Sequence, residues 1–421
     1  MTARSEEIGE DRADLVIVGA GTVGGWASCF ARQSGTKRVI VLERGRAGDG
    51  ASSRAAGIVR AQGGTPGTVR LGAWSIDFYQ RQEQELAIDS GFRELGYLIL
   101  ATTSQEEAAA HERIRMQRAS GLDVRWVDAA EAARLDSCLD STRLLGASYA
   151  PADGCIDPVR NVRAYSLAMQ ACAVELRERC TFTGIEEEKS AAGSRVTAVL
   201  TDVGRIETSR LILTGGPQLR EVGQRIGISI PAGAVRHQVA VTESRPEFQV
   251  ERRAMAFDLS GGLYWRLEDG GLLFGMSNPD EPPGVARSVD WAYLSAMRQR
   301  LAMFLPVTRQ LELRKVWAAT IDYTPDHQPI LGPAIRPDGR VIEGVTVASA
   351  GGHGMMWGPA VARIAADLAL EGKTALTDVS NWGLDRFDAD GHSRLATDPI
   401  ALPFPIVTSA PPLGEGRVGP H

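Results

Sequence analysis

The sequence of 421 residues has few of the side chains on which disulfide-bonded and metal-dependent proteins rely. It contains five cysteines and six histidines. The cysteines form no Cys-x-x-Cys pair, and no histidine stands at zinc-ligand spacing from them. An odd number of isolated cysteines is typical of reduced side chains that pack in an apolar interior. We therefore expect neither a disulfide framework nor a bound metal.

Long apolar runs and a surplus of positive charge are also missing. No apolar stretch approaches the ~18 residues that a membrane-spanning helix requires. The first thirteen residues are polar and carry more acidic than basic side chains, unlike a secretory signal. The net charge of −6 disfavours a general nucleic-acid or anionic-membrane surface. We expect a cytoplasmic protein without a nucleic-acid partner, and the bias toward Ala, Arg and Gly is typical of bacterial chains.

Glycine, by contrast, is abundant, with 46 residues, and its spacing near the N-terminus is informative. An apolar run ends at Val18, and Gly19, Gly21 and Gly24 follow it in a G-x-G-x-x-G pattern. These glycines permit a tight turn, close approach to a pyrophosphate, and close packing of the next helix. A second apolar run ends at Glu43, where a carboxylate accepts hydrogen bonds from ribose hydroxyls. Strand, glycines, helix and acid together predict a dinucleotide-binding unit rather than a plain glycine turn.

The periodicity of apolar residues predicts further elements of both kinds. Strands accumulate in the second half of the chain, which indicates sheet meeting sheet. We expect helices at 72–88, 105–120, 160–179, 289–304 and 358–370, and strands at 97–101, 195–200, 210–214, 238–242, 262–267, 271–276 and 345–349.

A second glycine turn stands between the last predicted strand and the last predicted helix. Gly351, Gly352 and Gly354 leave backbone amides uncovered where that helix begins. A helix N-terminus at this position stabilises negative charge. A plain strand-to-helix turn explains the same glycines equally well.

Together these segments resemble the D-amino-acid-oxidase-like superfamily of FAD enzymes, which includes glycine oxidase, sarcosine oxidase, dimethylglycine dehydrogenase and the β-subunit of proline dehydrogenase. The resemblance covers residues 13–387. It rests on GAGTVG with its terminal Glu43, ASSRAAGIVR, DGCIDP, TPDHQPILG and SAGGHGMMWGPAV, which occur in this order. It implies an α/β (α+β) fold, a Rossmann-like FAD-binding domain with an inserted antiparallel-sheet substrate domain.

The resemblance also implies a discontinuous domain organisation and a non-covalent cofactor. Monomeric sarcosine oxidases attach their flavin through a cysteine shortly before the TPD element, and no cysteine stands at 316–321 here. The implied FAD-binding domain comprises residues 13–90, 150–232 and 325–390, the substrate domain residues 91–149 and 233–324, and a proline-rich tail residues 391–421.

FAD-contacting positions follow from the same resemblance. They stand at the glycine turns, in the serine-rich segment, and at one position whose backbone usually meets adenine. The implied residues are Gly19, Gly21, Thr22, Val23, Gly24, Glu43, Arg44, Ser52, Ser53, Ala56, Gly57, Ile185, Thr214, Gly215, Gly216, Gly351, Gly352, His353, Gly354, Met355 and Met356.

The substrate residues are implied less directly, because this chain departs from its relatives. Arg60 matches an arginine that holds the substrate carboxylate, as a planar bidentate donor. Met356 stands where sarcosine oxidases have a lysine, Leu273 where they have the lysine that activates oxygen, and Ile321 where glycine and D-amino-acid oxidases have a carboxylate-binding arginine. We expect the catalytic site to contain Arg60, Tyr264, His353, Met356 and Tyr323, each of which has a purely structural alternative.

These observations predict an FAD-dependent amine oxidoreductase that transfers hydride to flavin and releases an imine for hydrolysis. An apolar wall in place of a lysine favours an N-substituted glycine with an apolar substituent. Oxygen or another acceptor would take the electrons. A primary or cyclic amino acid as substrate, such as glycine, a D-amino acid or proline, remains an alternative, as does a flavin subunit of a heteromeric electron-transfer complex. The oligomeric state is not predicted.

Overall fold

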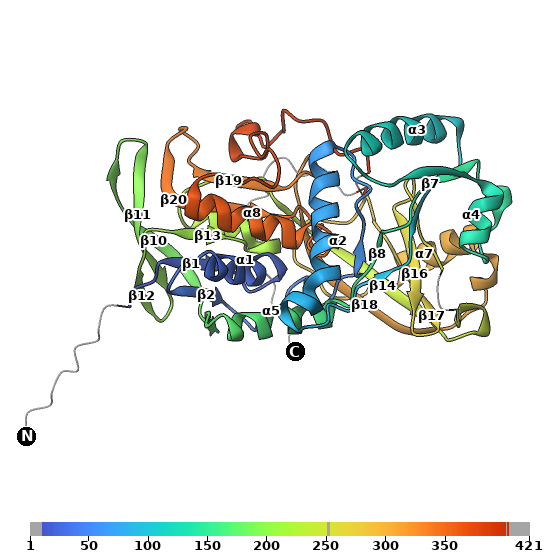
Figure 1. Cartoon of the computed structure of the whole chain (residues 1–421), viewed down its shortest axis with the longest axis horizontal. Coiled ribbons are helices and arrows are strands. Elements are labelled where there is room, and N and C mark those ends of the chain that lie inside the picture. Colours follow the sequence, from blue (N-terminus) through green and yellow to red (C-terminus); the bar gives the residue numbers. More distant parts are fainter. Residues whose placement is uncertain (1–10, 251–252, 401, 404–421) are drawn as a thin grey trace, which may run out of the picture.

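The computed structural model describes residues 11–250, 253–400 and 402–403. Two large sheets lie at opposite ends of an elongated molecule, and the long helix α2 (Pro66–Leu86) lies between them (Figure 1). This mixed α/β architecture confirms the predicted fold class. No described helix combines the length and apolar character that crossing a membrane requires.

The first sheet is built around β1 (Leu15–Val18). Alternate side chains of β1 enter different apolar clusters, Leu15 and Ile17 on one face and Val16 and Val18 on the other. A parallel strand covered on both faces reads as a continuous apolar run for this reason. The strand order is β10 (Phe182–Ser190), β11 (Gly193–Thr201), β20 (Val341–Ser349), β13 (Leu211–Leu213), β1, β2 (Val39–Glu43) and β9 (Glu175–Glu178), with β12 (Gly204–Glu207) beside β11 and β19 (Ile330–Ile335) beside β20.

Helices cover one face of this sheet, and glycines let them approach closely. Helices α1 (Thr22–Gln33) and α8 (Gly358–Glu371) lie side by side over it (Figure 1), and α5 (Pro158–Ala171) packs against α1. A Cβ at Gly24 would lie 1.9 Å from the carbonyl oxygen of Gly19. Only glycine therefore permits α1 to begin directly over the end of β1.

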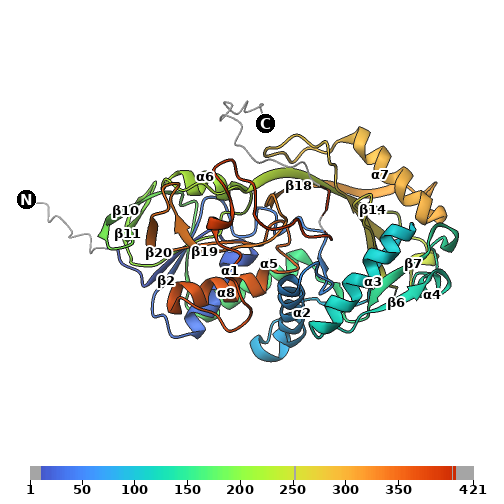
Figure 2. The same cartoon turned by 90° about the horizontal axis from the view of Figure 1, so that it is seen from above.

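The second sheet is mostly antiparallel. Its two longest strands, β14 (Gly233–Thr242) and β18 (Leu313–Tyr323), extend from it toward the first sheet (Figure 2). The helix α7 (Trp291–Phe304) packs on the strands β16 and β17. The order is β18 (Leu313–Tyr323), β14 (Gly233–Thr242), β17 (Gly271–Met276), β16 (Leu263–Glu268), β15 (Met255–Asp258), β5 (Tyr97–Ala101), β7 (Gly146–Ala150) and β6 (Arg125–Asp128), with helices α3 (Ser104–Ala119), α4 (Ala129–Leu135) and α7 (Trp291–Phe304).

Smaller elements connect the two sheets. A short three-stranded sheet joins the chain segments that enter and leave α2, and the short helix α6 follows the strand β13. The bounds are β3 (Ile58–Val59), β4 (Arg93–Glu94), β8 (Gly154–Cys155) and α6 (Leu219–Gln224).

Two of the predicted helices differ from the observed ones by more than two residues at one end. The helix expected at 72–88 begins at Pro66, because Thr65 caps it and exchanges hydrogen bonds with Thr68. The helix expected over 160–179 was wrong in its second half. It ends at Ala171, and residues 175–178 form the strand β9, which pairs in parallel with β2. That pairing joins segments far apart in the chain, so local periodicity did not reveal it.

The start of the expected tail is packed against the protein. Ser393 donates a hydrogen bond to Asp326, and Ile400 is 1% exposed. Residues 404–421, which carry most of the proline-rich stretch, lie outside the described residues. The described part of the tail therefore packs on the folded body.

Candidate functional site

A cavity of about 480 Å³ runs between the two sheets. Its wall includes Val18 and Leu42 from the ends of two parallel strands of the first sheet, and Tyr264 and Ala319 from the second. Ligands of open α/β sheets bind outside the carboxyl ends of the strands. The cavity is therefore where the sequence predicted a dinucleotide.

At one end of the cavity, the first glycine turn meets the serine-rich segment. Gly19 has a φ of +102°, which favours glycine. The Thr22 backbone N–H donates to the Ser52 hydroxyl at 3.0 Å, and a Cβ at Gly21 would lie 3.1 Å from that oxygen. Gly21, which precedes α1, has no side chain with which to cap this helix. The amides of this turn therefore face a space suited to phosphate oxygens.

Glu43 is held firmly at the end of β2. Its two carboxylate oxygens accept the backbone N–H groups of Ala20 at 3.0 Å and Gly45 at 2.8 Å. The cavity wall beside it includes Cys180 and Phe182. Sequence reasoning missed these two residues, because the crossing between β9 and β10 that brings them there is not local.

The second glycine turn borders the middle of the cavity. Gly352 has a φ of +87°, and a Cβ there would lie 2.7 Å from the Asp322 carbonyl oxygen. Gly358, the first residue of α8, approaches Thr22 so closely that a Cβ would lie 2.8 Å from the threonine methyl. The N-termini of α1 and α8 therefore adjoin at the cavity. Neither Gly21 nor Trp357, the residues that precede these two helices, caps its helix with a side chain.

His353 is a neutral side chain in this turn. Its Nδ1 lies 3.0 Å from the Gly351 carbonyl oxygen, and its ring packs on Trp357 with centroids 4.0 Å apart. Burial, and then the nearby charge of Arg60, lowers the pKa of His353 to about 3. The imidazole therefore carries no charge near neutral pH.

Arg60 is a buried cation of the cavity wall, and its charge lies close to Tyr97. It is 5% exposed and lines the cavity. It donates to the carbonyl oxygens of Gln62 and, at 3.2 Å, Ile400. A guanidinium has five N–H donors, so these two contacts leave donors for a ligand anion.

A buried network behind Arg60 holds its loop. Asp153 accepts the Ala61 backbone N–H at 2.7 Å and the Gln62 side-chain amide at 3.2 Å. The Gln62 amide oxygen in turn accepts the Ser148 hydroxyl at 2.8 Å. Burial raises the pKa of Asp153 to about 6. The sequence analysis did not identify this network, whose members come from two segments about 90 residues apart in the chain.

Tyr264 also lines the cavity and has a partner that we did not expect. Its hydroxyl lies 2.7 Å from Nε2 of His237, which stands on the strand β14 of the same sheet. Burial lowers the pKa of His237 to about 4 and raises the pKa of Tyr264. The pair is therefore uncharged. A histidine within the apolar pattern of β14 was the only sequence signal for it.

The structure brings most of the predicted residues to one surface. Those that line the cavity are Gly19, Gly21, Thr22, Val23, Glu43, Arg44, Ser52, Ala56, Gly57, Arg60, Thr214, Gly215, Gly216, Tyr264, Gly352, His353, Gly354, Met355 and Met356. Further lining residues that we did not single out include Tyr97, Phe257, Asp322 and Leu402.

Five predicted residues do not line the cavity. Gly24 lies beneath the first turn, Gly351 lies against the Gln328 carbonyl, Ile185 packs on the core of the first sheet, and Tyr323 packs against Gly233. Ser53 belongs to the serine-rich turn but lies outside the lining. The spacing of the motifs placed these residues near the site without deciding which way they face.

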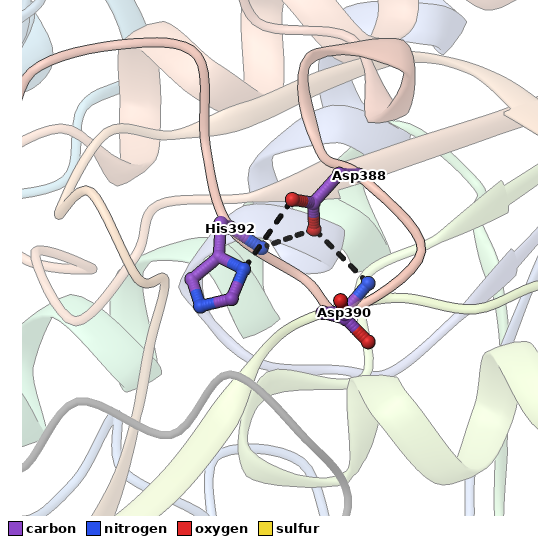
Figure 3. Close-up of side chains that lie close together, drawn as sticks. All are labelled: Asp388, Asp390 and His392. Atoms are coloured by element: carbon purple, nitrogen blue, oxygen red, sulfur yellow. Dashed lines mark hydrogen bonds and ion pairs between the residues drawn. The ribbon is translucent and has the colours of Figure 1, made fainter.

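One group of possible metal ligands lies outside the cavity. Asp388, Asp390 and His392 are exposed, and their ligand atoms lie within 4.8 Å of one another (Figure 3). Asp388 accepts the backbone N–H of Asp390 at 3.0 Å and of His392 at 2.8 Å. These hydrogen bonds account for the group as a turn stabilised by Asp388.

The cavity fits the FAD that the sequence predicts. Two glycine turns border it, and Glu43 offers an anionic acceptor on its wall. The adjoining N-termini of α1 and α8 supply positive potential for anionic groups. The backbone amide donors suit the phosphates of FAD, and the Glu43 carboxylate suits the hydroxyls of its ribose.

Comparisons with known proteins agree with this fit. The family model for FAD dependent oxidoreductases matches residues 14–368. Mitochondrial dimethylglycine dehydrogenase from Rattus norvegicus is 26% identical over 382 residues, which cover 86% of this chain and 44% of that protein. Glycine oxidase from Geobacillus kaustophilus is 27% identical over 386 residues, 89% of this chain and 97% of that protein.

Solved structures are similar in fold. The crystal structure of L-proline dehydrogenase from P. horikoshii superposes with a TM-score of 0.80 at 23% identity, covering 89% of this chain and 97% of that one. The chain spans less than half the length of the rat relative. The resemblance inferred from the motifs is confirmed, and the chain belongs to the family of FAD-dependent oxidoreductases.

Proposed function

We propose that this protein oxidises the C–N bond of an amino acid, and that its substrate is an N-substituted glycine with an apolar substituent. The observation that carries this proposal is Arg60, a buried cation at the end of a cavity whose neighbouring walls are aromatic or apolar. Those walls include Tyr97, Phe257 and Leu402. One carboxylate and one apolar group complement such a surface.

Bound FAD would supply a two-electron acceptor for hydride. The residues that would hold it are the two glycine turns, Ser52 and Glu43. We propose that it binds without a covalent link. Cys180 is the one cysteine among the described residues that lines the cavity, and its backbone N–H donates to the Glu43 carbonyl at 2.9 Å. Because Glu43 would bind the ribose of the adenosine, this cysteine would lie at the adenosine end and would be out of reach of the flavin ring.

Arg60 would bind the substrate carboxylate and orient the carbon that is oxidised. Its contacts with two backbone carbonyls hold the guanidinium in one place before the substrate binds. The neutral His237 and Tyr264 add no second charge to this end of the cavity. The carboxylate therefore has one buried cation to pair with, which determines the direction in which the amine points.

The names of similar proteins support this substrate class. Dimethylglycine is a glycine with substituents on nitrogen, and the rat enzyme that bears its name is similar over 86% of this chain. Glycine oxidase supports an amino acid substrate more generally.

We propose oxygen or another acceptor for the electrons. We also propose that residues 13–90, 150–232 and 325–390 form the cofactor domain and that residues 91–149 and 233–324 form the substrate domain.

Anaerobic bleaching of the flavin absorption band tests the proposal. Purified protein would be mixed with glycine, sarcosine, longer N-alkylglycines, proline and D-amino acids. Selective bleaching by N-alkylglycines is the expected result. Faster bleaching by proline, glycine or D-amino acids would replace the proposed substrate with a cyclic or primary amino acid. A yellow protein that none of them bleaches would contradict amino acid oxidation by this chain alone.

A further inference from the structure

We propose that the C-terminal arm, defined here by Asp398, Pro399, Ile400, Leu402 and Pro403, forms the wall of the cavity that sets the size of the substrate's nitrogen substituent. This inference rests on the proposed function. It assigns a specificity-determining role to Leu402 and a positioning role to the backbone of Ile400. The sequence analysis treated this segment as part of a tail.

Ile400 joins the arm to the substrate end of the cavity. Its side chain is 1% exposed and belongs to the apolar cluster that contains Tyr97, Phe257 and Tyr264. Its carbonyl oxygen accepts a hydrogen bond from Arg60 at 3.2 Å. The same residue therefore packs on the aromatic wall and orients the cation that would bind a carboxylate.

Leu402 faces the cavity itself. It lines the cavity and packs against the same apolar cluster. Pro403 lies against Gly262, where a Cβ would come within 2.8 Å of the proline ring. The arm thus reaches the residue that precedes β16, the strand that carries Tyr264, and Leu402 contributes an uncharged branched side chain to the wall.

Hydrogen bonds hold the arm from two sides. The Asp398 carboxylate accepts the Ile400 backbone N–H at 2.8 Å and the Thr68 hydroxyl at 3.3 Å. The Asp398 backbone N–H donates to the Asp326 carbonyl at 3.0 Å. A Cβ at Gly64 would lie 2.0 Å from the Asp398 carboxylate, so the loop before α2 closes tightly over it.

A buried ion pair supports the second of these sides. The Asp326 carboxylate pairs with Arg386 at 2.7 and 3.1 Å, and each side chain is 1% exposed. The turn that contains Asp326 is therefore held by contacts within the protein. Hydrogen bonds of Asp398 to this turn and to Thr68 anchor the arm. Leu402 therefore has a defined position relative to Arg60. A substituent on the substrate's nitrogen would meet a wall of fixed size.

The test compares Leu402→Ala, Leu402→Phe and the control Leu395→Ala in the full FAD-loaded chain. Leu395 is a half-buried leucine of the preceding segment that packs on the core of the first sheet and does not line the cavity. Two readouts are used. The first is the ratio of anaerobic flavin-bleaching rates with N-butylglycine and sarcosine. The second is the ratio of calorimetric affinities for hexanoate and acetate, which carry the carboxylate but cannot be oxidised at a C–N bond.

We expect Leu402→Ala to raise both ratios by at least about 10-fold, since a methylene in an apolar pocket discriminates by 10-fold or more. Leu402→Phe should lower both ratios, and Leu395→Ala should leave them within twofold of the parent.

If the parent is bleached by N-alkylglycines but neither Leu402 variant shifts its ratios, only the proposed role of the arm is overturned. If no N-alkylglycine bleaches the parent but the affinity ratios shift, the proposed function fails, and with it the nitrogen substituent, while Leu402 keeps its role as a size-limiting wall for carboxylate ligands. If neither ratio shifts and nothing is bleached, both fail.

Discussion

Arg60 is the proposed partner of the substrate carboxylate, and two backbone carbonyls hold its guanidinium in place. Its loss should therefore affect substrate binding more than the loss of any other side chain. We expect Arg60→Ala to raise the half-saturating substrate concentration at least ~10-fold, because a charge-assisted pair worth about 1.5–3 kcal/mol is lost. Arg60→Lys should recover only part of the loss, since an ammonium cannot present two parallel donors. A titration of anaerobic flavin bleaching measures the half-saturating substrate concentration of both variants.

The control is Arg70→Ala, which changes an exposed arginine of α2 outside the cavity. An unchanged half-saturation in Arg60→Ala would remove this residue from the carboxylate site.

His237 should make the fold sensitive to mild acid. Burial lowers its pKa from 6.5 to about 4. Between these values the unfolded chain binds a proton that the folded chain does not, so stability is present above pH 6.5 and is lost as the pH falls toward 4. The loss is on the order of 3 kcal/mol across that interval. We expect His237→Gln, which can still hydrogen-bond the Tyr264 hydroxyl, to reduce the slope.

Urea unfolding at pH 7, 6 and 5 measures this slope. His353, whose pKa lies at about 3 for similar reasons, remains in the variant and keeps part of the acid sensitivity. His111→Gln serves as a control because His111 is exposed. Equal slopes in the parent and His237→Gln would contradict a buried neutral histidine at this position.

At the scale of elements, the turn between β20 and α8 shows how much a glycine contributes. Gly352 combines a φ of +87° with a Cβ position 2.7 Å from the Asp322 carbonyl oxygen. We expect Gly352→Ala to lower the free energy of unfolding by about 1–3 kcal/mol, because the left-handed conformation and the backbone contact both oppose a side chain.

Gly354 provides the matched control for Gly352 within the same turn. A Cβ at Gly354 would meet nothing within 4 Å, and its φ is not in the left-handed region. Gly354→Ala should therefore leave the urea midpoint of the FAD-free protein nearly unchanged. A midpoint for Gly352→Ala that matches that of Gly354→Ala would show that the turn relaxes at little cost.

Elements also show where local patterns were sufficient. The strands β5 and β17 have the predicted bounds of 97–101 and 271–276, because their apolar runs are bordered by glycine and polar residues. The strand β9 was missed, because Glu175–Glu178 has little apolar character and forms a strand only through its pairing with β2. Short edge strands of this kind depend on their neighbour more than on their own sequence.

For the whole molecule, FAD should act as a stabilising ligand that joins the two sheets. Because the cavity takes its walls from both sheets, removal of FAD should lower the thermal midpoint. Free FAD at a hundred times its dissociation constant should restore about 2.7 kcal/mol of stability. Differential scanning fluorimetry with increasing FAD measures this effect. FMN at equal concentration is the control, since it lacks the adenosine part that would face Glu43, and it should stabilise less.

The same preparation tests how FAD is attached. Acid or urea denaturation should release all of the flavin into the filtrate as unmodified FAD. Flavin that stays with the denatured chain would contradict non-covalent binding. Equal stabilisation by FMN and FAD would instead contradict the placement of adenosine near Glu43.

The sequence by itself determined the dinucleotide-binding end of the molecule. A turn at Gly19, a close approach at Gly24 and an acid at Glu43 are requirements of a single short βαβ unit, so their spacing along the chain carries the information. For the same reason, the turn from Gly351 to Gly354 was recognisable before its surroundings were known.

Only the tertiary structure decided what surrounds Arg60. Its partner Ile400 is 340 residues away in the chain, and His237 meets Tyr264 across the second sheet. Tyr323, which we expected in the site, packs against Gly233 instead. Such contacts depend on how strands from separate segments pair and on which way their side chains then point. No local pattern encodes either, and so the chemistry of the substrate end appears only in the folded chain.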